Sequence, residues 1–283
     1  MGLRPIVVFR IVAWWKFYRR AVTKYKVHSP FVFEWITEVL EDRRYYYAFD
    51  EIAALRGKML QNRTPVTITD FGAGPDGAYA GSTTPVVRTT TLSKLVHRSG
   101  SDARQGARLF RLVKWHQPKQ ILELGSSVGI STLYIAKSGS SLARITALEG
   151  CPQSASIARM NLEALGVANT AIITGPFSET LQQTVASYPV LDFVFFDGNH
   201  QEEPTLAYVE VCLSKAHDDT IFVLDDVHWS PGMEAAWEKV KAHPRITMTI
   251  DCGDFACAFF RKDFKEKQHF QIVPSRWKPW MVY

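Results

Sequence analysis

Short apolar runs alternate with longer segments of helical periodicity through the second half of the chain. The apolar runs predict strands, and apolar residues spaced three or four positions apart predict the helices between them. Strands that alternate with helices imply right-handed crossovers and a mostly parallel sheet. The strands are expected at 119–124, 144–149, 170–175, 191–197, 220–226, 245–251 and 255–262, and the helices near 130–138, 152–165, 178–187, 203–214 and 231–242.

The last two predicted strands follow each other with no helix between them. They are therefore expected to form a hairpin, which places one antiparallel strand in the sheet. The fold class predicted from this pattern is α/β, with a seven-stranded, mostly parallel sheet and one antiparallel strand. A helical N-terminal region precedes it.

The N-terminal region lacks this regular alternation. Residues 6–57 show helical periodicity, in which Ser29 and Pro30 have the positions of an N-cap and a first helical residue. Residues 65–71 predict a short strand, and 72–90, which are rich in Gly, Pro, Ser and Thr, predict a loop. Short helices are expected near 91–97 and 102–116.

Three parts are expected along the chain. Residues 1–100 form a helical and loop region that covers the substrate, residues 101–262 form the main domain, and residues 263–283 form a C-terminal tail. The tail contains Trp277 and Trp280. Exposing both would be costly, so the tail is expected to pack on the body or on a partner. The sequence leaves the oligomeric state open.

Composition narrows the class of protein. Hydrophobic residues make up 46% and charged residues 22%, a balance that allows a large core. The four cysteines are scattered without a CxxC pair, which favours reduced thiols in a cytoplasmic protein. No apolar run of about 18 residues predicts a transmembrane segment, and the N-terminus lacks the pattern of a secretory signal.

Charge is concentrated at the N-terminus. Residues 1–33 contain seven Lys or Arg and no acid, whereas the whole chain has a net charge of +5. A basic, aromatic-rich helix suits peripheral contact with an anionic membrane or with RNA. We favour the simpler interpretation, in which the basic face is solvated and the apolar stripe packs on the body. That stripe consists of Val8, Ile11, Val12 and Trp15.

A glycine turn follows the first strand of the regular region. Ligands of such sheets bind beyond the carboxyl ends of the strands, so the residues placed there are candidates for binding. Here they are Glu123, Gly125, Ser126, Ser127 and Gly129, within "ILELGSSVGIST". The G-x-x-x-G spacing differs from G-x-G-x-x-G, which argues against a dinucleotide pyrophosphate site.

The ends of the next two strands carry an acid and an aromatic residue. Glu149 lies about 20 residues beyond the glycine turn, where a carboxylate accepts hydrogen bonds from both ribose hydroxyls. Phe177 follows the third strand, where its ring either packs on an adenine face or joins the core.

Acids and histidines gather at the fourth and fifth strand ends. "DFVFFDGNH" ends in Asp197 and His200, and "VLDDVHW" contains Asp225 and Asp226. Three acids on adjacent strand ends suit a divalent cation such as Mg²⁺, which prefers oxygen ligands. One or more of these acids also suits another role, as a helix cap or as the partner of a basic side chain.

Together these motifs resemble the class I S-adenosylmethionine-dependent methyltransferases, a Rossmann-like family. The resemblance covers about residues 102–262 and is greatest to the small O-methyltransferases of the catechol and caffeoyl-CoA type. It implies that Gly125 to Gly129 hold the methionine part of S-adenosyl-L-methionine, Glu149 its ribose and Phe177 its adenine. It also implies that Asp197, Asp225 and Asp226 occupy the metal positions, with Asp226 where the family has Asn.

The resemblance places His200 where this family has a lysine that helps to deprotonate the acceptor. A histidine suits a general base near neutral pH. The implied function is methylation of a hydroxyl group on a small-molecule acceptor, with Asp197 orienting His200. Three alternatives stay open: an RNA-directed methyltransferase that uses the basic arm, a nicotinamide-dependent oxidoreductase, and a binding protein without activity.

An earlier glycine-rich stretch, residues 68–81, also looks like a nucleotide loop. No helix with an apolar stripe follows it at once, and no acid-tipped strand appears about 20 residues later. We interpret it as part of a cover over the site that helps to admit the acceptor.

Overall fold

The computed structural model describes residues 5–74, 78, 84–99, 102–139, 142–264 and 266–281. The strands in these residues are β1 (Pro65–Asp70), β2 (Val86–Thr91), β3 (Gln120–Leu124), β4 (Arg144–Glu149), β5 (Thr170–Thr174), β6 (Leu191–Phe196), β7 (Ala216–Asp225), β8 (Met248–Asp251), β9 (Phe255–Phe259) and β10 (Gln268–Gln271). The helices are α1 (Pro5–Arg20), α2 (Pro30–Trp35), α3 (Tyr47–Gln61), α4 (Leu92–Ser99), α5 (Ala103–His116), α6 (Ile130–Ser138), α7 (Pro152–Ala164), α8 (Phe177–Ala186), α9 (Glu202–Leu213) and α10 (Pro231–Ala242).

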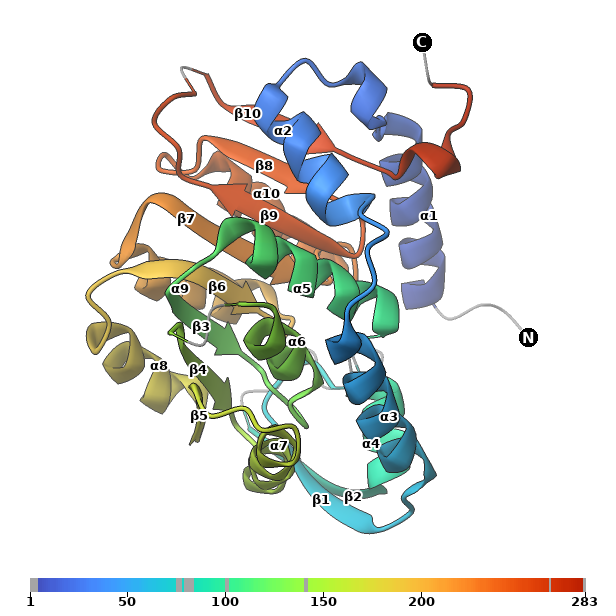
Figure 1. The fold of residues 1–283 in the computed structure, drawn as a ribbon. Coiled ribbons are helices and arrows are strands. Elements are labelled where there is room, and N and C mark those ends of the chain that lie inside the picture. Colours follow the sequence, from blue (N-terminus) through green and yellow to red (C-terminus); the bar gives the residue numbers. More distant parts are fainter. Residues whose placement is uncertain are drawn as a thin grey trace.

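One large sheet lies at the centre of the molecule, with a two-stranded β1–β2 hairpin beside it (Figure 1). The strand order in the large sheet is β10-β8-β9-β7-β6-β3-β4-β5. Strand β9 is antiparallel to β7 and β8, and the other neighbouring pairs are parallel. The α/β class, the mostly parallel sheet and the antiparallel strand are therefore confirmed.

Helices cover both faces of the large sheet because successive residues on a strand point to opposite sides. On β3, Ile121 packs in a cluster with residues of α2 and α5, whereas Leu122 packs with residues of α8, α9 and α10. Both side chains are fully buried. With both faces covered, the carboxyl ends of the strands are where a ligand can reach the sheet.

Two strands were missed by the sequence pattern. The large sheet has eight strands rather than seven, because β10 pairs in parallel with β8 at the edge. Its sequence, "QHFQ", has no apolar run, as an edge strand with partly exposed side chains needs none. Strand β2 lies in the predicted loop 72–90, where it pairs with β1. Residues 75–77 and 79–83 of that loop lie outside the described residues.

Helix α2 begins as the sequence predicted. The backbone N–H of Val32 donates to Ser29 Oγ at 3.4 Å, so Ser29 is the N-cap and Pro30 the first helical residue. Val32 and Trp35 are then fully buried against the sheet. The N-terminal helices thus contribute to the same core as the sheet, while the division at residues 100 and 262 stays a prediction.

The packing predicted for α1 is wrong. Val8 and Ile11 are 45% and 56% exposed, and Val12 and Trp15 are 44% and 56% exposed. The residues of α1 that are buried are instead Ala13 and Phe17. The helix therefore turns its apolar stripe away from the body. No helix in the described residues is long and apolar enough to cross a membrane.

The C-terminal tail packs beside α1 (Figure 1). Tyr18 Oη donates to the carbonyl of Trp277 at 2.8 Å, and the buried Lys278 Nζ donates to the carbonyl of Ala21 at 2.6 Å. Trp280, in contrast, is 68% exposed. The tail thus anchors the end of α1 while leaving one tryptophan in solvent.

Candidate active site

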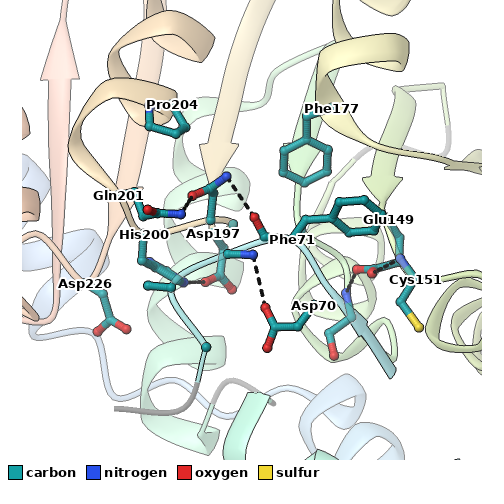
Figure 2. A pocket seen from close by; sticks show the side chains of 18 of the residues that line it. Asp70, Phe71, Glu149, Cys151, Phe177, Asp197, His200, Gln201, Pro204 and Asp226 are labelled. Carbon is teal, nitrogen blue, oxygen red and sulfur yellow. Dashed lines mark hydrogen bonds and ion pairs between the residues drawn. The ribbon is translucent and has the colours of Figure 1, made fainter. Parts of the chain in front are cut away.

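A cavity of about 950 Å³ lies at the carboxyl ends of the strands (Figure 2). Residues that follow strands β3 to β7 line it, as expected for a sheet of this kind. The predicted site residues that it brings together are Gly125, Ser127, Glu149, Phe177, Asp197, His200, Asp225 and Asp226.

The turn after β3 passes close to the end of β6. Gly125 has φ +100°, and a Cβ there would lie 2.1 Å from the carbonyl oxygen of Asp197. A residue with a side chain therefore cannot replace it without moving the backbone. Gly129 has φ +84° and lets α6 begin close to Ala158, where a Cβ would lie 3.1 Å away. Both glycines thus allow the turn after β3 to pack closely on neighbouring segments.

Glu149 is held by the backbone on two sides. Its Oε2 accepts from the backbone N–H of Ser127 at 2.7 Å, and its Oε1 accepts from that of Cys151 at 2.8 Å. Burial raises the pKa of the Glu149 carboxyl, and the two backbone hydrogen bonds oppose that rise. Each carboxylate oxygen keeps a second lone pair for another donor.

Asp197 and Asp225 form a buried pair of carboxyl groups. They are hydrogen-bonded to each other, and Asp225 also accepts from the side-chain amide of Gln105. Burial, followed by the neighbouring acids, raises the pKa of both groups well above the usual range. Burial and the close approach of the two acids thus disfavour the state in which both carboxyl groups are ionised.

The acids do not assemble into a metal site in this structure. Over the residues that the structure describes, no group of three or more His, Cys, Asp or Glu is arranged to hold a metal ion. The predicted donor set is therefore not assembled here, and a role of Asp197, Asp225 and Asp226 as cation ligands stays a prediction.

His200 lies beside Asp197 at the cavity wall. Its Nε2 is 3.6 Å from Asp197 Oδ1, and its ring centroid is 5.9 Å from that of Trp229. About a quarter of the His200 side chain is exposed, so a substrate in the cavity can reach the ring. The predicted base and its predicted orienting acid are therefore neighbours.

Residues 71–74 form a strap across the loop that carries His200. The backbone N–H of Ala73 donates to the carbonyl of Asn199 at 2.8 Å, and Asn199 Nδ2 donates to the carbonyl of Phe71 at 3.2 Å. A Cβ on Gly72 would lie 2.9 Å from Asn199 backbone atoms. Residues 68–74 of the early glycine stretch thus line the cavity, while the interpretation of the stretch as a cover stays a prediction.

Phe71 contributes a second aromatic ring to the wall. A Cβ on Gly150 would lie 2.7 Å from this ring, so the strap packs directly on the turn after Glu149. In Figure 2 the rings of Phe71 and Phe177 both lie near Glu149. Phe177 itself packs on Gly198 and lies 5.4 Å from the ring of Tyr208. It therefore both lines the cavity and joins the packing, as the two sequence interpretations allowed.

Backbone strain gathers around the cavity. The described residues other than glycine with positive φ include Ser127 at +47°, Asn199 at +71°, His200 at +52° and Asp226 at +54°. Such conformations cost of order 1–3 kcal/mol each and persist where the surroundings enforce them. They cluster at functional sites, so their position at three strand ends supports this cavity as the site.

Some predicted residues lie beneath the cavity rather than in it. Glu123, Ser126 and Gly129 are not among its lining residues. Glu123 is fully buried, and its Oε1 accepts from Ser131 Oγ at 2.5 Å. Burial raises the pKa of Glu123 to about 7. These residues support the turn after β3 from the interior of the protein and do not line the cavity.

The N-terminal region supplies lining residues that the sequence did not reveal. Arg10 of α1 donates from Nε to the carbonyl of Trp229 at 3.0 Å, and its guanidinium lies 4.6 Å from that ring. Gln105 and Arg88 also line the cavity. No local motif marks these residues, because only the packing of α1, β2 and α5 on the sheet brings them there.

Comparison with known proteins agrees with this geometry. Residues 122–227 match the family model of a methyltransferase domain. This part of the chain is a methyltransferase domain. The matched segment runs from β3 to the loop after β7 and so contains most of the strand ends that line the cavity. The resemblance to the class I methyltransferases is confirmed.

Two curated relatives are similar over less than half of the chain. A catechol O-methyltransferase of Mycobacterium tuberculosis (strain ATCC 25618 / H37Rv) is 34% identical over 131 residues, which are 46% of this chain and 58% of that protein. A catechol O-methyltransferase of Niastella koreensis is 31% identical over 125 residues, which are 44% of this chain and 56% of that protein. The chain thus spans little more than half the length of these methyltransferases.

A solved structure supports the fold over a larger share of the chain. The O-methyltransferase from Bacillus cereus, solved in complex with SAH, has a TM-score of 0.55 and 22% identity. The match covers 81% of this chain and 97% of that one. At this sequence identity the similarity shows a shared fold and nothing about function.

Proposed function

We propose that this chain is an S-adenosylmethionine-dependent methyltransferase that methylates a hydroxyl group of a small molecule. The proposal rests on one observation, which is that the oriented carboxylate of Glu149 and the pair of His200 and Asp197 line the same cavity of about 950 Å³. The methyltransferase domain and the catechol O-methyltransferase relatives support it.

The residues at the cavity fit S-adenosylmethionine. The free lone pairs of Glu149 suit the two ribose hydroxyls, and Phe71 and Phe177 offer apolar faces for the adenine. Gly125 and Ser127 would hold the methionine part through the turn after β3. When bound, this cofactor supplies a methyl group that is attacked in line by a nucleophile.

We assign to His200 the role of generating that nucleophile. Its imidazole would take the proton from the acceptor hydroxyl through Nδ1, the ring nitrogen that does not face Asp197, and the adjacent Asp197 would orient the ring through Nε2. The cavity wall around it, from Trp229 and the Phe71–Gly74 strap, would hold the acceptor and exclude water. We assign no step of this mechanism to a divalent cation, because the acids that the structure describes are not arranged as a ligand set.

The test combines cofactor binding with turnover. We expect S-adenosylhomocysteine to bind in calorimetry and a screen of hydroxylated acceptors to give methyl transfer. His200→Ala should lower kcat by about 100-fold or more, the usual contribution of a general base, with the Kd for S-adenosylhomocysteine nearly unchanged. His28→Ala, at an exposed histidine away from the cavity lining, is the matched control.

The opposite pattern would refute the assignment of His200: weaker cofactor binding with turnover preserved. Addition of Mg²⁺ or of a chelator tests the cation directly, and a large dependence of kcat on Mg²⁺ would restore the acids as ligands. The comparisons do not favour the RNA-directed or nicotinamide-dependent alternatives. Binding of NAD in place of S-adenosylhomocysteine would revive the second of these.

A further inference from the structure

Helix α1 has one side on the protein and the other side in solvent. Ala13 and Phe17 are buried, and Phe17 packs against Ala21 and Val273. Arg10 lies on the same side and contacts Trp229 at the cavity. These contacts orient the helix firmly, so the residues opposite to them face outward.

The outward side is apolar. Val8, Ile11, Val12 and Trp15 are spaced i, i+3, i+4 and i+7, which places them in one stripe, and each is between 44% and 56% exposed. Trp14, beside the stripe, is 47% exposed. A contiguous patch of this kind on a folded protein marks an interaction surface, because its exposure to water is unfavourable.

Basic residues adjoin this stripe, with Lys16 beside it and Arg19 one turn beyond Trp15. Lys16, Arg19 and Arg20 are exposed and form no ion pair with any residue that the structure describes. Residues 1–33 contain seven Lys or Arg and no acid, whereas the rest of the chain has a net charge of −2. The partner of this surface must therefore offer both an apolar phase for the stripe and negative charge for the basic residues.

We propose that α1 lies on an anionic membrane surface, with Val8, Ile11, Val12 and Trp15 at the boundary of the acyl chains. Aliphatic and tryptophan side chains insert at that depth, and lysine and arginine attract anionic headgroups. A second copy of the chain would bring two clusters of like charge together. RNA would leave the aliphatic stripe without a partner, because its backbone and bases offer mainly charge and stacking.

The contact is peripheral and reaches the catalytic region. No described helix is able to span a membrane, so the helix lies on the surface. Arg10 of the same helix lines the cavity and contacts Trp229. A membrane bound by α1 would therefore lie close to the cavity. This inference rests on exposure and charge and is independent of the proposed methyl transfer.

The experiment measures binding of the full chain to extruded vesicles by co-sedimentation. We expect binding to vesicles of phosphatidylcholine mixed with phosphatidylglycerol, weakening as salt is added, and little binding to phosphatidylcholine alone. Ile11→Glu and Trp15→Glu should each weaken binding about tenfold or more by placing a charge in the apolar boundary. Lys16→Ala and Arg19→Ala should each weaken it about fivefold.

Met160→Glu is the matched control. Met160 is 56% exposed on helix α7, the same exposure as Ile11 and Trp15, so a charge there should leave vesicle binding unchanged. Circular dichroism of each variant establishes that it is folded. Equal binding by Ile11→Glu, Trp15→Glu and Met160→Glu would overturn the proposal, as would equal binding to both vesicle types.

Two further results would also overturn it. One is a dimer in light scattering that Ile11→Glu dissociates, in a chain that does not sediment with vesicles. The other is salt-dependent RNA binding without vesicle binding. Loss of methyl transfer has no bearing on these outcomes, because each is measured without acceptor or cofactor.

Discussion

Single residues at this site are defined by burial as much as by chemical type. Glu123 and Glu149 are both acids at the ends of adjacent strands, yet only Glu149 lines the cavity. Glu149 has a backbone N–H donor on each oxygen, whereas Glu123 accepts from Ser131 in the closed interior. The same side chain therefore lines the cavity at one position and is enclosed in the core at the other.

Glu123 should make the stability of the cofactor-free chain depend on pH. Its pKa of about 7 in the folded state lies above the ordinary 4.5, so the folded chain binds more protons between these pH values. The free energy of unfolding therefore falls as the pH rises from about 4.5 through 7, by roughly 3 kcal/mol for this group. Glu123→Gln should remove most of this decline.

Urea denaturation at pH 5 and pH 8 checks this expectation. Glu123→Gln should gain stability over the unmodified chain at pH 8 and much less at pH 5. Glu163→Gln, on an exposed position of α7, is the control. A pH dependence that is the same with and without Glu123 would contradict the assignment.

Among the elements, the β1–β2 hairpin and its strap act on the loop after β6. The strap fixes Asn199 by two hydrogen bonds, and Asn199 and His200 are both in the left-handed region. Because that conformation is strained, the contacts from residues 71–74 help to maintain it. We therefore expect the strap to position the proposed base through Asn199.

Gly72→Ala tests this role of the strap. A Cβ 2.9 Å from Asn199 backbone atoms forces the two segments apart, which should cost about 1–3 kcal/mol of stability. It should also lower kcat for methyl transfer by moving His200. Gly57→Ala is the control, because nothing lies within 4 Å of that Cβ and the change in mid-helix should stabilise by about 0.5–1 kcal/mol. Unchanged kinetics for Gly72→Ala would rule the strap out as a positioning element.

At the scale of the whole molecule, the two ends of the chain stabilise each other. Val22 forms a β-bridge with Ile272, and Lys278 Nζ donates to the carbonyl of Ala21. The same tail segment supplies β10 at the edge of the large sheet. The basic helix α1 and the sheet edge are thus held by one C-terminal segment.

Deletion of residues 266–283 should therefore affect both ends. It removes β10 and leaves the polar backbone groups of β8 unpaired, and it also removes the partners of Ala21 and Tyr18. We expect the free energy of unfolding to fall by several kcal/mol and α1 to become sensitive to protease. Trp280→Ala, at a side chain that is 68% exposed, should change stability little. An unchanged unfolding midpoint in the deleted chain would contradict this coupling.

The local sequence by itself determined the alternation of strands and helices from β3 to β9 and the residues at each strand end. Apolar runs and glycine turns act over a few residues, so the positions of Glu149, Asp197 and His200 followed from pattern alone. The features that depend on long-range packing were decided only by the tertiary structure. It joined Asn199 to the strap, paired Asp197 with Asp225, added β10 at the sheet edge and turned the apolar stripe of α1 outward. Each of these depends on contacts between residues far apart in the chain, which no local periodicity encodes.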